Sequence, residues 1–95
     1  MTDIYRALDD ATRRKILDVL SERDGQSLFE LCGTLTMNHG VSQSRQSISQ
    51  HLTLLEEAGL IRVERAGRVK FHYFTPGPLA EITRRWPQAI EGDQA

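Results

Sequence analysis

The sequence has little of several residue types that define common classes of protein. A single cysteine, Cys32, cannot close an internal disulfide, which fits a reducing compartment such as the cytoplasm. No apolar run approaches the roughly 20 residues that span a bilayer, and the N-terminus has no signal-peptide pattern. Only one Trp, two Tyr and three Phe are present, so a single chain can bury only a modest core that a second copy could extend. These shortages argue against a disulfide-stabilised secreted protein and against a membrane protein.

Motifs for catalysis and metal binding are also missing. The chain has no nucleophile–base motif, no glycine loop that could cradle phosphate and no paired carboxylates in a predicted cleft, so we do not expect an enzyme. Cys32 and the three histidines show no ligand spacing, and we expect neither a metal site nor a cofactor. We expect Cys32 to be a small buried apolar residue and His51 a hydrogen-bonded structural group. A redox role for Cys32 would need a partner thiol, such as that of a second copy, or a sulfenic acid.

What the sequence does contain is typical of one globular domain. Apolar residues make up 39% and charged residues 26%, with a net charge of −1. Residues 41–75 carry five Lys/Arg against three Asp/Glu, or +2, while the segments before and after are negative. This local excess indicates a polyanion contact on one face, although small imbalances of this kind are also common on solvated surfaces. We expect one domain over residues 1–91 and a flexible tail over residues 92–95.

Hydrophobic periodicity predicts four helices in the first two thirds of the chain. They cover residues 3–8, 11–22, 28 to a break at 39–40, and 45–58. Asp10 and Ser27 are suited to cap the second and third helices, and Gly25 to end the second. Ser44 or Ser42 caps the fourth.

The remaining third of the chain predicts a β-hairpin and a last helix. Apolar and polar residues alternate from Ile61 to Glu64 and from Val69 to Tyr73, with a turn at 66–67. Pro78 opens a short final helix. The predicted fold is mainly α with a small β-hairpin, in the order of a winged helix-turn-helix.

The predicted helix 45–58 has two faces of different chemistry. Leucines and Ile48 share the inner face, whereas the outer face has no carboxylate until Glu56 and Glu57. Carboxylates are repelled by DNA phosphates, whereas Arg, Gln, Ser and Thr can donate to phosphates and to base edges. A solvated outer face is the alternative, but such faces are usually rich in Lys and Glu.

The predicted hairpin at 61–75 adds cations beside that helix. Arg65 and Arg68 flank its tip, where they could straddle a phosphate ridge or enter a minor groove. A solvated hairpin end is the alternative, and the combination with the preceding helix favours DNA. The candidate DNA-binding residues are Ser44, Arg45, Gln46, Ser49, Gln50, Thr53, Arg65, Arg68 and Lys70.

Three segments resemble the ArsR-type winged-helix repressors of prokaryotes. They read "DDATRRKILDVL", "SISQHLTLLEEAGLIRVERAGRVKFHYF" and "PLAEITRRW", and the likeness spans about Ile4 to Trp86. The resemblance implies a cytoplasmic, nucleoid-associated homodimer whose first and last helices form the interface. It also implies that the fourth helix reads a palindromic operator, that the hairpin acts as a wing, and that a signal relieves repression.

The chain departs from the family pattern at four places. Metal sensors of the family carry Cys-x-Cys in the third helix, where this chain has Thr34 in place of the second thiolate, and the last helix offers only Glu81. This implies a member without the metal site. Ala11 replaces a common proline, and the turn "GVSQSRQSIS" is about two residues longer than usual. The longer turn leaves open whether Arg45 meets a base or a phosphate.

Apolar residues at both ends of the chain support a dimer independently. The candidate interface residues are Ile4, Tyr5, Leu8, Leu79, Ile82 and Trp86. Pairing two copies would bury surface worth ~25 cal/mol per Å² before association costs, while the alternative is that these helices close the core of one chain.

Two functions are compatible with these patterns. The first is a sequence-specific, homodimeric DNA-binding repressor whose partners are double-stranded DNA, a second copy and an inducer of unknown identity. The second is a winged-helix module that contacts another protein and does not bind DNA. The near-neutral charge favours the second, but apolar residues are absent from the outer positions 45, 46, 49, 50 and 53.

Overall fold

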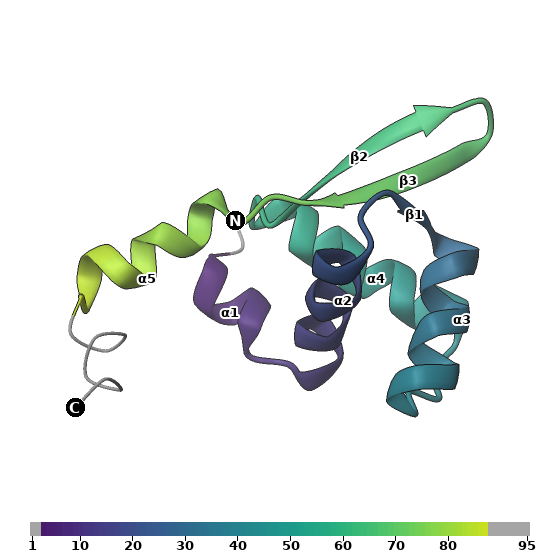
Figure 1. Cartoon of the computed structure of the whole chain (residues 1–95), viewed down its shortest axis with the longest axis horizontal. Coiled ribbons are helices and arrows are strands. Elements are labelled where there is room, and N and C mark those ends of the chain that lie inside the picture. The colour runs from purple at the N-terminus through teal and green to yellow at the C-terminus, as the bar shows by residue number, and fades with distance from the viewer. Residues whose placement is uncertain (1–2, 88–95) are drawn as a thin grey trace.

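The computed structural model describes residues 3–87 as a mainly helical domain with a small antiparallel sheet (Figure 1). Its elements are α1 (Ile4–Leu8), α2 (Ala11–Glu22), β1 (Gln26–Ser27), α3 (Leu28–His39), α4 (Arg45–Glu57), β2 (Ile61–Ala66), β3 (Val69–Phe74), the 3-10 helix η1 (Gly77–Leu79) and α5 (Ala80–Arg85). The predicted winged helix-turn-helix is therefore confirmed. The tail predicted at 92–95 lies outside the described residues.

Side-chain caps fix where the central helices begin. The Asp10 carboxylate accepts a hydrogen bond from the Arg13 amide at 3.0 Å and starts α2. Ser27 and Glu30 form the predicted capping box at the start of α3. Of the two serines considered for α4, Ser44 is the cap, and its Oγ accepts from the Ser47 amide at 3.0 Å.

The sheet has three strands, in the order β1-β3-β2, rather than the two predicted. β1 has only two residues, too few for an alternating pattern, and pairs Gln26 with His72 of β3. The chain reaches β1 through Gly25, whose φ of +70° disfavours other residues. A Cβ at Gly25 would also lie 2.9 Å from the Tyr73 ring, so the glycine allows the close approach to β3.

The hairpin turn and the last helix differ slightly from prediction. Ala66 pairs with Val69, so the turn consists of Gly67 and Arg68 rather than residues 66–67. The predicted position was one residue early, because Gly67, with φ +64°, occupies the first turn position instead of the second. Arg68 therefore lies in the turn itself. The 3-10 helix η1 begins at Gly77, one residue before Pro78, and α5 follows η1.

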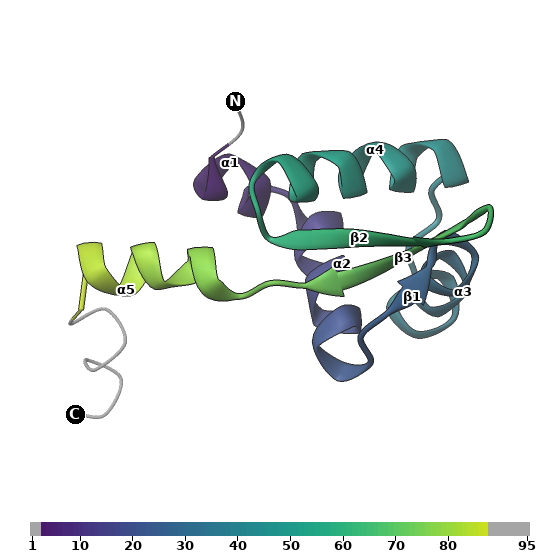
Figure 2. The same ribbon diagram turned by 90° about the horizontal axis from the view of Figure 1, so that it is seen from above.

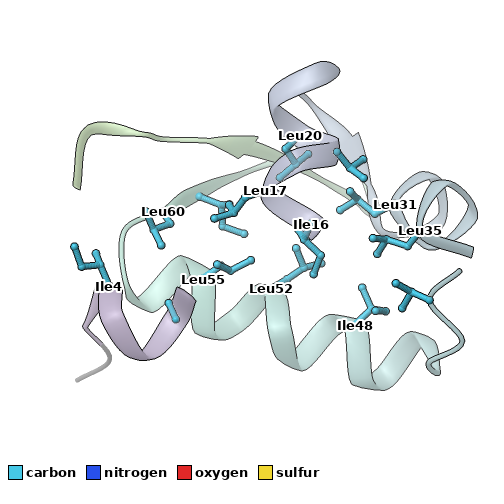
Figure 3. Close-up of a cluster of buried hydrophobic side chains, with 14 residues drawn as sticks. Ile4, Ile16, Leu17, Leu20, Leu31, Leu35, Ile48, Leu52, Leu55 and Leu60 are labelled. Carbon is cyan, nitrogen blue, oxygen red and sulfur yellow. The ribbon is translucent and has the colours of Figure 1, made fainter. Parts of the chain in front are cut away.

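A single hydrophobic core holds α4 against α2 and α3 (Figure 3). Its fully buried side chains include Ile16, Leu20, Leu31, Leu35, Ile48, Leu55 and Leu60. Each contributes about 1.5–3 kcal/mol on burial, so the inner face of α4 is fixed and its opposite face is left outward. α5 projects from this body beside α1 (Figures 1 and 2). Within residues 3–87, no helix has both the length and the apolar character needed to cross a bilayer.

Candidate nucleic-acid interface

All nine residues predicted to contact DNA are exposed. Five come from the outer face of α4, Ser44 caps that helix, and Arg65, Arg68 and Lys70 come from the β2–β3 hairpin, here called the wing. Thr53 also donates its hydroxyl to the Ser49 carbonyl at 3.2 Å, which fixes its rotamer on the helix surface. The inner and outer faces of α4 are therefore assigned as predicted. The roles of the nine residues in binding remain predictions.

A groove of about 430 Å³ separates α4 from the wing and brings part of this set together. We call it the α4–wing groove. It is lined by Ser27, Leu28, Phe29, Arg45, Ser49, Leu52, Thr53, Glu56, Val63, Arg68, Val69, Lys70 and His72. Five of the nine predicted residues are among them, whereas Ser44, Gln46, Gln50 and Arg65 lie outside the groove.

Four cations on this face have no hydrogen-bond or ion-pair partner among residues 3–87. In the described part of the chain, no hydrogen bond or ion pair engages the side chains of Arg45, Arg65, Arg68 or Lys70. The nearby Arg62 differs, because it pairs with Glu64 at 2.7 Å and stacks over an aromatic ring. Exposed guanidinium groups without internal partners can bind phosphate or guanine with two hydrogen bonds.

One carboxylate shares the groove with these cations. Glu56 lines it together with Arg68 and Lys70, although Glu56 comes after the carboxylate-free part of the outer face of α4. The groove therefore has three cationic side chains against one anionic side chain. A phosphate that enters it is attracted from the wing side and repelled from the Glu56 side, which favours its approach near Arg45 and the wing tip.

The start of α4 faces the same end of the molecule as the wing tip (Figure 2). The positive end of the helix dipole and the amides of the first turn lie there, beside Arg45. A helix of 13 residues with this polarity can enter a major groove by its N-terminal half and direct its amides at the backbone.

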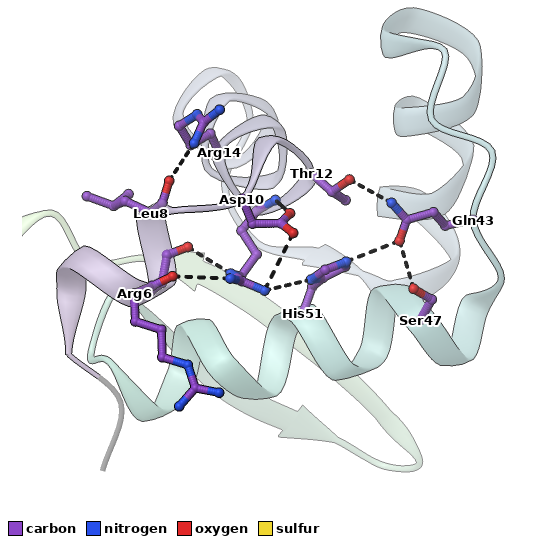
Figure 4. Close-up of polar contacts among 10 residues, drawn as sticks. Arg6, Leu8, Asp10, Thr12, Arg14, Gln43, Ser47 and His51 are labelled. Carbon is purple, nitrogen blue, oxygen red and sulfur yellow. Dashed lines mark hydrogen bonds and ion pairs between the residues drawn. The ribbon is translucent and has the colours of Figure 1, made fainter.

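A hydrogen-bonded chain of polar residues positions that end of α4 (Figure 4). Arg13 donates to the carbonyls of Arg6 and Ala7 at 3.1 and 2.8 Å, and its Nη1 lies 3.1 Å from His51 Nδ1. A guanidinium only donates, so Nδ1 accepts and the ring proton of neutral His51 is at Nε2. Nε2 then donates to Gln43 Oε1 at 3.1 Å. The predicted hydrogen-bonded role of His51 is confirmed.

Gln43 connects the long turn before α4 to two other elements. Its Oε1 accepts from the Ser47 hydroxyl at 2.7 Å, and its Nε2 donates to Thr12 Oγ1 at 2.7 Å. The turn is therefore held to both α2 and the first turn of α4. Sequence reasoning missed Gln43 and Arg13, because their partners are 31 and 38 residues away along the chain. The only sequence signal was a histidine on an otherwise apolar stripe.

Cys32 is less buried than predicted. It is half-buried and packs against the edge of the core. Burial raises the pKa of the Cys32 thiol, and the positive charge of Arg45 opposes this only in part. Across residues 3–87, the structure has no group of three or more His, Cys, Asp or Glu residues that could hold a metal ion.

The residues predicted for a dimer interface differ in burial within one chain. Ile4 is 6% exposed and belongs to the core, so for Ile4 burial is complete without a partner. Tyr5, Leu8, Leu79 and Ile82 are half-buried. Trp86 is 48% exposed and meets the Tyr5 ring edge-on, with centroids 6.1 Å apart.

Comparisons with known proteins agree with this architecture. A family model described as a helix-turn-helix domain matches residues 8–64, which include α2, α3, α4 and part of the wing. The uncharacterized HTH-type transcriptional regulator YuzN of Bacillus subtilis is 42% identical over 83 residues, covering 87% of this chain and 90% of YuzN. The transcriptional repressor SdpR of the same organism is 33% identical over 72 residues, covering 76% of this chain and 72% of SdpR.

Solved structures give the same result. An ArsR-like transcriptional regulator from Rhodococcus sp. RHA1 superposes with a TM-score of 0.74 at 29% identity, covering 96% of this chain and 78% of that one. The crystal structure of another ArsR family transcriptional regulator gives a TM-score of 0.75 at 26% identity, covering 97% and 88%. The family is one of regulators and not of enzymes. The chain belongs to the helix-turn-helix transcriptional regulators of the ArsR type.

Proposed function

We propose that the protein is a sequence-specific DNA-binding repressor that acts at the nucleoid in the cytoplasm. The observation that carries this proposal is the outward face of α4, which exposes Arg and amide side chains beside the unpaired cations of the wing. These groups donate hydrogen bonds, which is what phosphates and the acceptors of guanine and adenine require. The repressor role is supported by the relationship to SdpR.

The positions of the side chains divide them into a group that recognises bases and a group that contacts the DNA backbone. Arg45, Gln46 and Gln50 lie on the first turns of α4, where a helix inserted in the major groove meets base edges. Arg65 and Arg68, at or beside the wing turn, would contact the phosphate backbone or the adjacent minor groove. Side chains of the first group determine sequence preference, and those of the second group determine affinity for DNA of any sequence.

A two-fold dimer would present two copies of α4 to a palindromic operator. Half-sites separated by about one helical turn, roughly 34–36 Å, match such a pair. The projecting helix α5 and the exposed ring of Trp86 support this part of the proposal. Both give the molecule an exposed surface, at the end away from the wing tip, that a second copy could cover.

A protein-interaction module is the competing function. Its support is the net charge of −1 together with Phe29 and Met37 on α3, which are 75% and 84% exposed. The outer face of α4 has no such apolar group, so this function would use α3 rather than the outer face of α4.

Selection of bound fragments from genomic DNA tests the two functions against each other. The repressor hypothesis expects enrichment of fragments that share a palindrome, and retarded mobility of those fragments in a gel at low salt. The affinity should fall steeply as salt rises, because bound phosphates release counterions. Recovery of unrelated fragments only, or of none, would contradict the proposal and leave the protein-interaction module.

A further inference from the structure

The α4–wing groove has features that phosphate contact alone does not require. Its lining includes Phe29 and Val69, which are 75% and 44% exposed. Exposed apolar side chains are expected to be scattered singly over a surface, but these two face one concave site. Hydrophobic walls beside three cations form a surface suited to a molecule that is part apolar and part anionic.

A buried imidazole lies in the same groove. His72 lines it and is only 5% exposed. Its Nδ1 lies 2.8 Å from the Gln26 carbonyl, which can only accept, so Nδ1 carries the ring proton. The other nitrogen, Nε2, has no hydrogen-bond partner among residues 3–87. In the neutral ring Nε2 is an acceptor, so the groove offers a place for a hydroxyl donor.

The charge and the volume of the groove further limit the class of molecule that could bind in it. Arg45, Arg68 and Lys70 face the groove against the single carboxylate of Glu56, which selects for an anion. Its volume of about 430 Å³ lies within the range of roughly 300–1,000 Å³ that small-molecule sites occupy. A hydroxylated aromatic carboxylate meets all three requirements with its charge, its ring and its hydroxyl.

We propose that the α4–wing groove binds small hydroxylated aromatic carboxylates, and that a bound molecule of this class displaces DNA. Displacement follows from geometry, because Arg45, Ser49, Thr53, Arg68 and Lys70 belong both to the groove and to the proposed DNA contact. This regulatory half rests on the proposed DNA-binding function, whereas binding of the small molecule does not.

The test titrates 6-hydroxy-2-naphthoate, whose hydroxyl cannot reach its own carboxylate, into the full chain without DNA, followed by amide NMR shifts and by calorimetry. The shifts should be largest for the residues that line the groove. 2-Naphthoate, which lacks the hydroxyl, should bind about fivefold more weakly, as expected for one lost hydrogen bond. 2-Naphthol, which lacks the carboxylate, should bind at least about tenfold more weakly, because charged hydrogen bonds are the stronger ones.

Phe29→Ser separates the small-molecule site from the DNA contact. The side chain is 75% exposed, so the fold should persist, and Phe29 is not one of the proposed DNA contacts. We expect about a tenfold loss of affinity for 6-hydroxy-2-naphthoate, the size of a lost phenyl contact, with DNA affinity within about twofold. The matched control is Met37→Ser, which is 84% exposed on the same helix outside the groove and should change neither affinity.

A competition experiment then tests the regulatory half. Added 6-hydroxy-2-naphthoate should raise the apparent Kd for a selected DNA fragment in wild type, and less so in Phe29→Ser. Shifts spread evenly over the cationic face, or unchanged binding by Phe29→Ser, would overturn the site. DNA binding without any binding of the naphthoate would overturn this inference alone. Naphthoate binding by a protein that binds no DNA would sustain the site and overturn its regulatory role together with the proposed function.

Discussion

A single imidazole, that of His51, links the N-terminal helix pair to the start of α4. On one side it accepts from Arg13, which also holds the carbonyls at the end of α1, and on the other it donates to Gln43. Arg13 is only 8% exposed, so its charge needs these acceptors and the nearby carboxylate of Asp10. The neutral Nε2–H tautomer satisfies both neighbours of His51 at once.

We predict energetic coupling between His51 and Gln43. Each of His51→Ala and Gln43→Ala should lower the free energy of unfolding by about 1 kcal/mol, because each removes hydrogen bonds. The double variant should lose less than the sum, with a coupling of about 0.5–1 kcal/mol, as measured by urea unfolding. His51→Ala combined with Gln50→Ala, on the exposed face of the same helix, is the control and should be additive. Additive effects in both pairs of substitutions would mean that the hydrogen bond between His51 and Gln43 contributes nothing to the free energy of unfolding.

Asp10 predicts how stability depends on pH. Burial would raise the pKa of Asp10, but the hydrogen bond from the Arg13 amide and the charge of Arg13 hold that pKa below its ordinary value. A depressed pKa stabilises the fold above the unfolded-state pKa of about 4, and this contribution is lost as the pH falls through the folded-state value.

Asp10→Asn tests this dependence because it keeps a capping side chain and removes the charge. At pH 7 we expect the free energy of unfolding to fall by about 0.5 kcal/mol, since Asp10 is partly exposed and screened. At an acidic pH below the folded-state pKa of Asp10, where the carboxyl is protonated, wild type and variant should converge. Circular dichroism in urea at both pH values measures the difference, and an equal difference at both would refute the charge argument.

At the scale of elements, local signals determined which predictions succeeded. Asp10, Ser27 and Ser44 cap helices by contacts to amides three residues on, so their roles could be predicted from sequence. β1 could not be predicted, because its two residues are paired only through β3, 44 to 46 residues later. Gln43 likewise depends on Thr12, on another helix. The outward face of α4 was predictable because its periodicity is local. The groove between α4 and the wing could not be predicted, because it is formed by segments that are far apart along the chain.

The different roles proposed for α4 and for the wing predict different binding defects. Arg45→Ala or Gln50→Ala should reduce affinity for the selected operator by about 1–3 kcal/mol and relax sequence preference. Arg68→Ala should weaken binding to all sequences alike and reduce the salt slope by about one unit. Fluorescence anisotropy with operator and scrambled duplexes at several salt concentrations separates these outcomes.

Arg84→Ala provides a matched control for charge. Arg84 is an exposed cation on α5, at the other end of the molecule from the groove. It should leave both sequence preference and salt slope unchanged. If operator affinity survives both the α4 and the wing substitutions, the assignment of the binding face is wrong.

At the scale of the whole molecule, the described chain is elongated along the direction in which α5 projects. Its principal extents are 45 × 27 × 22 Å, and its radius of gyration of 14.2 Å exceeds the roughly 12 Å of a compact chain of this length. α5 has no buried residue of its own. A helix with no buried residue in one chain is stabilised by pairing with a second copy, because pairing buries apolar surface that the monomer leaves exposed to water.

Trp86→Glu should therefore separate the proposed dimer without unfolding the monomer. Trp86 is the C-cap of α5 and is 48% exposed, so a carboxylate is tolerated in one chain but costly when buried between two. Sedimentation equilibrium should give the mass of two chains for wild type and of one for the variant, at equal helix content by circular dichroism. Met37→Glu, exposed on α3, should remain dimeric. A monomeric variant that keeps full affinity for the palindrome would show that the two half-sites are bound independently, because a dimer gains its operator affinity by engaging both half-sites at once.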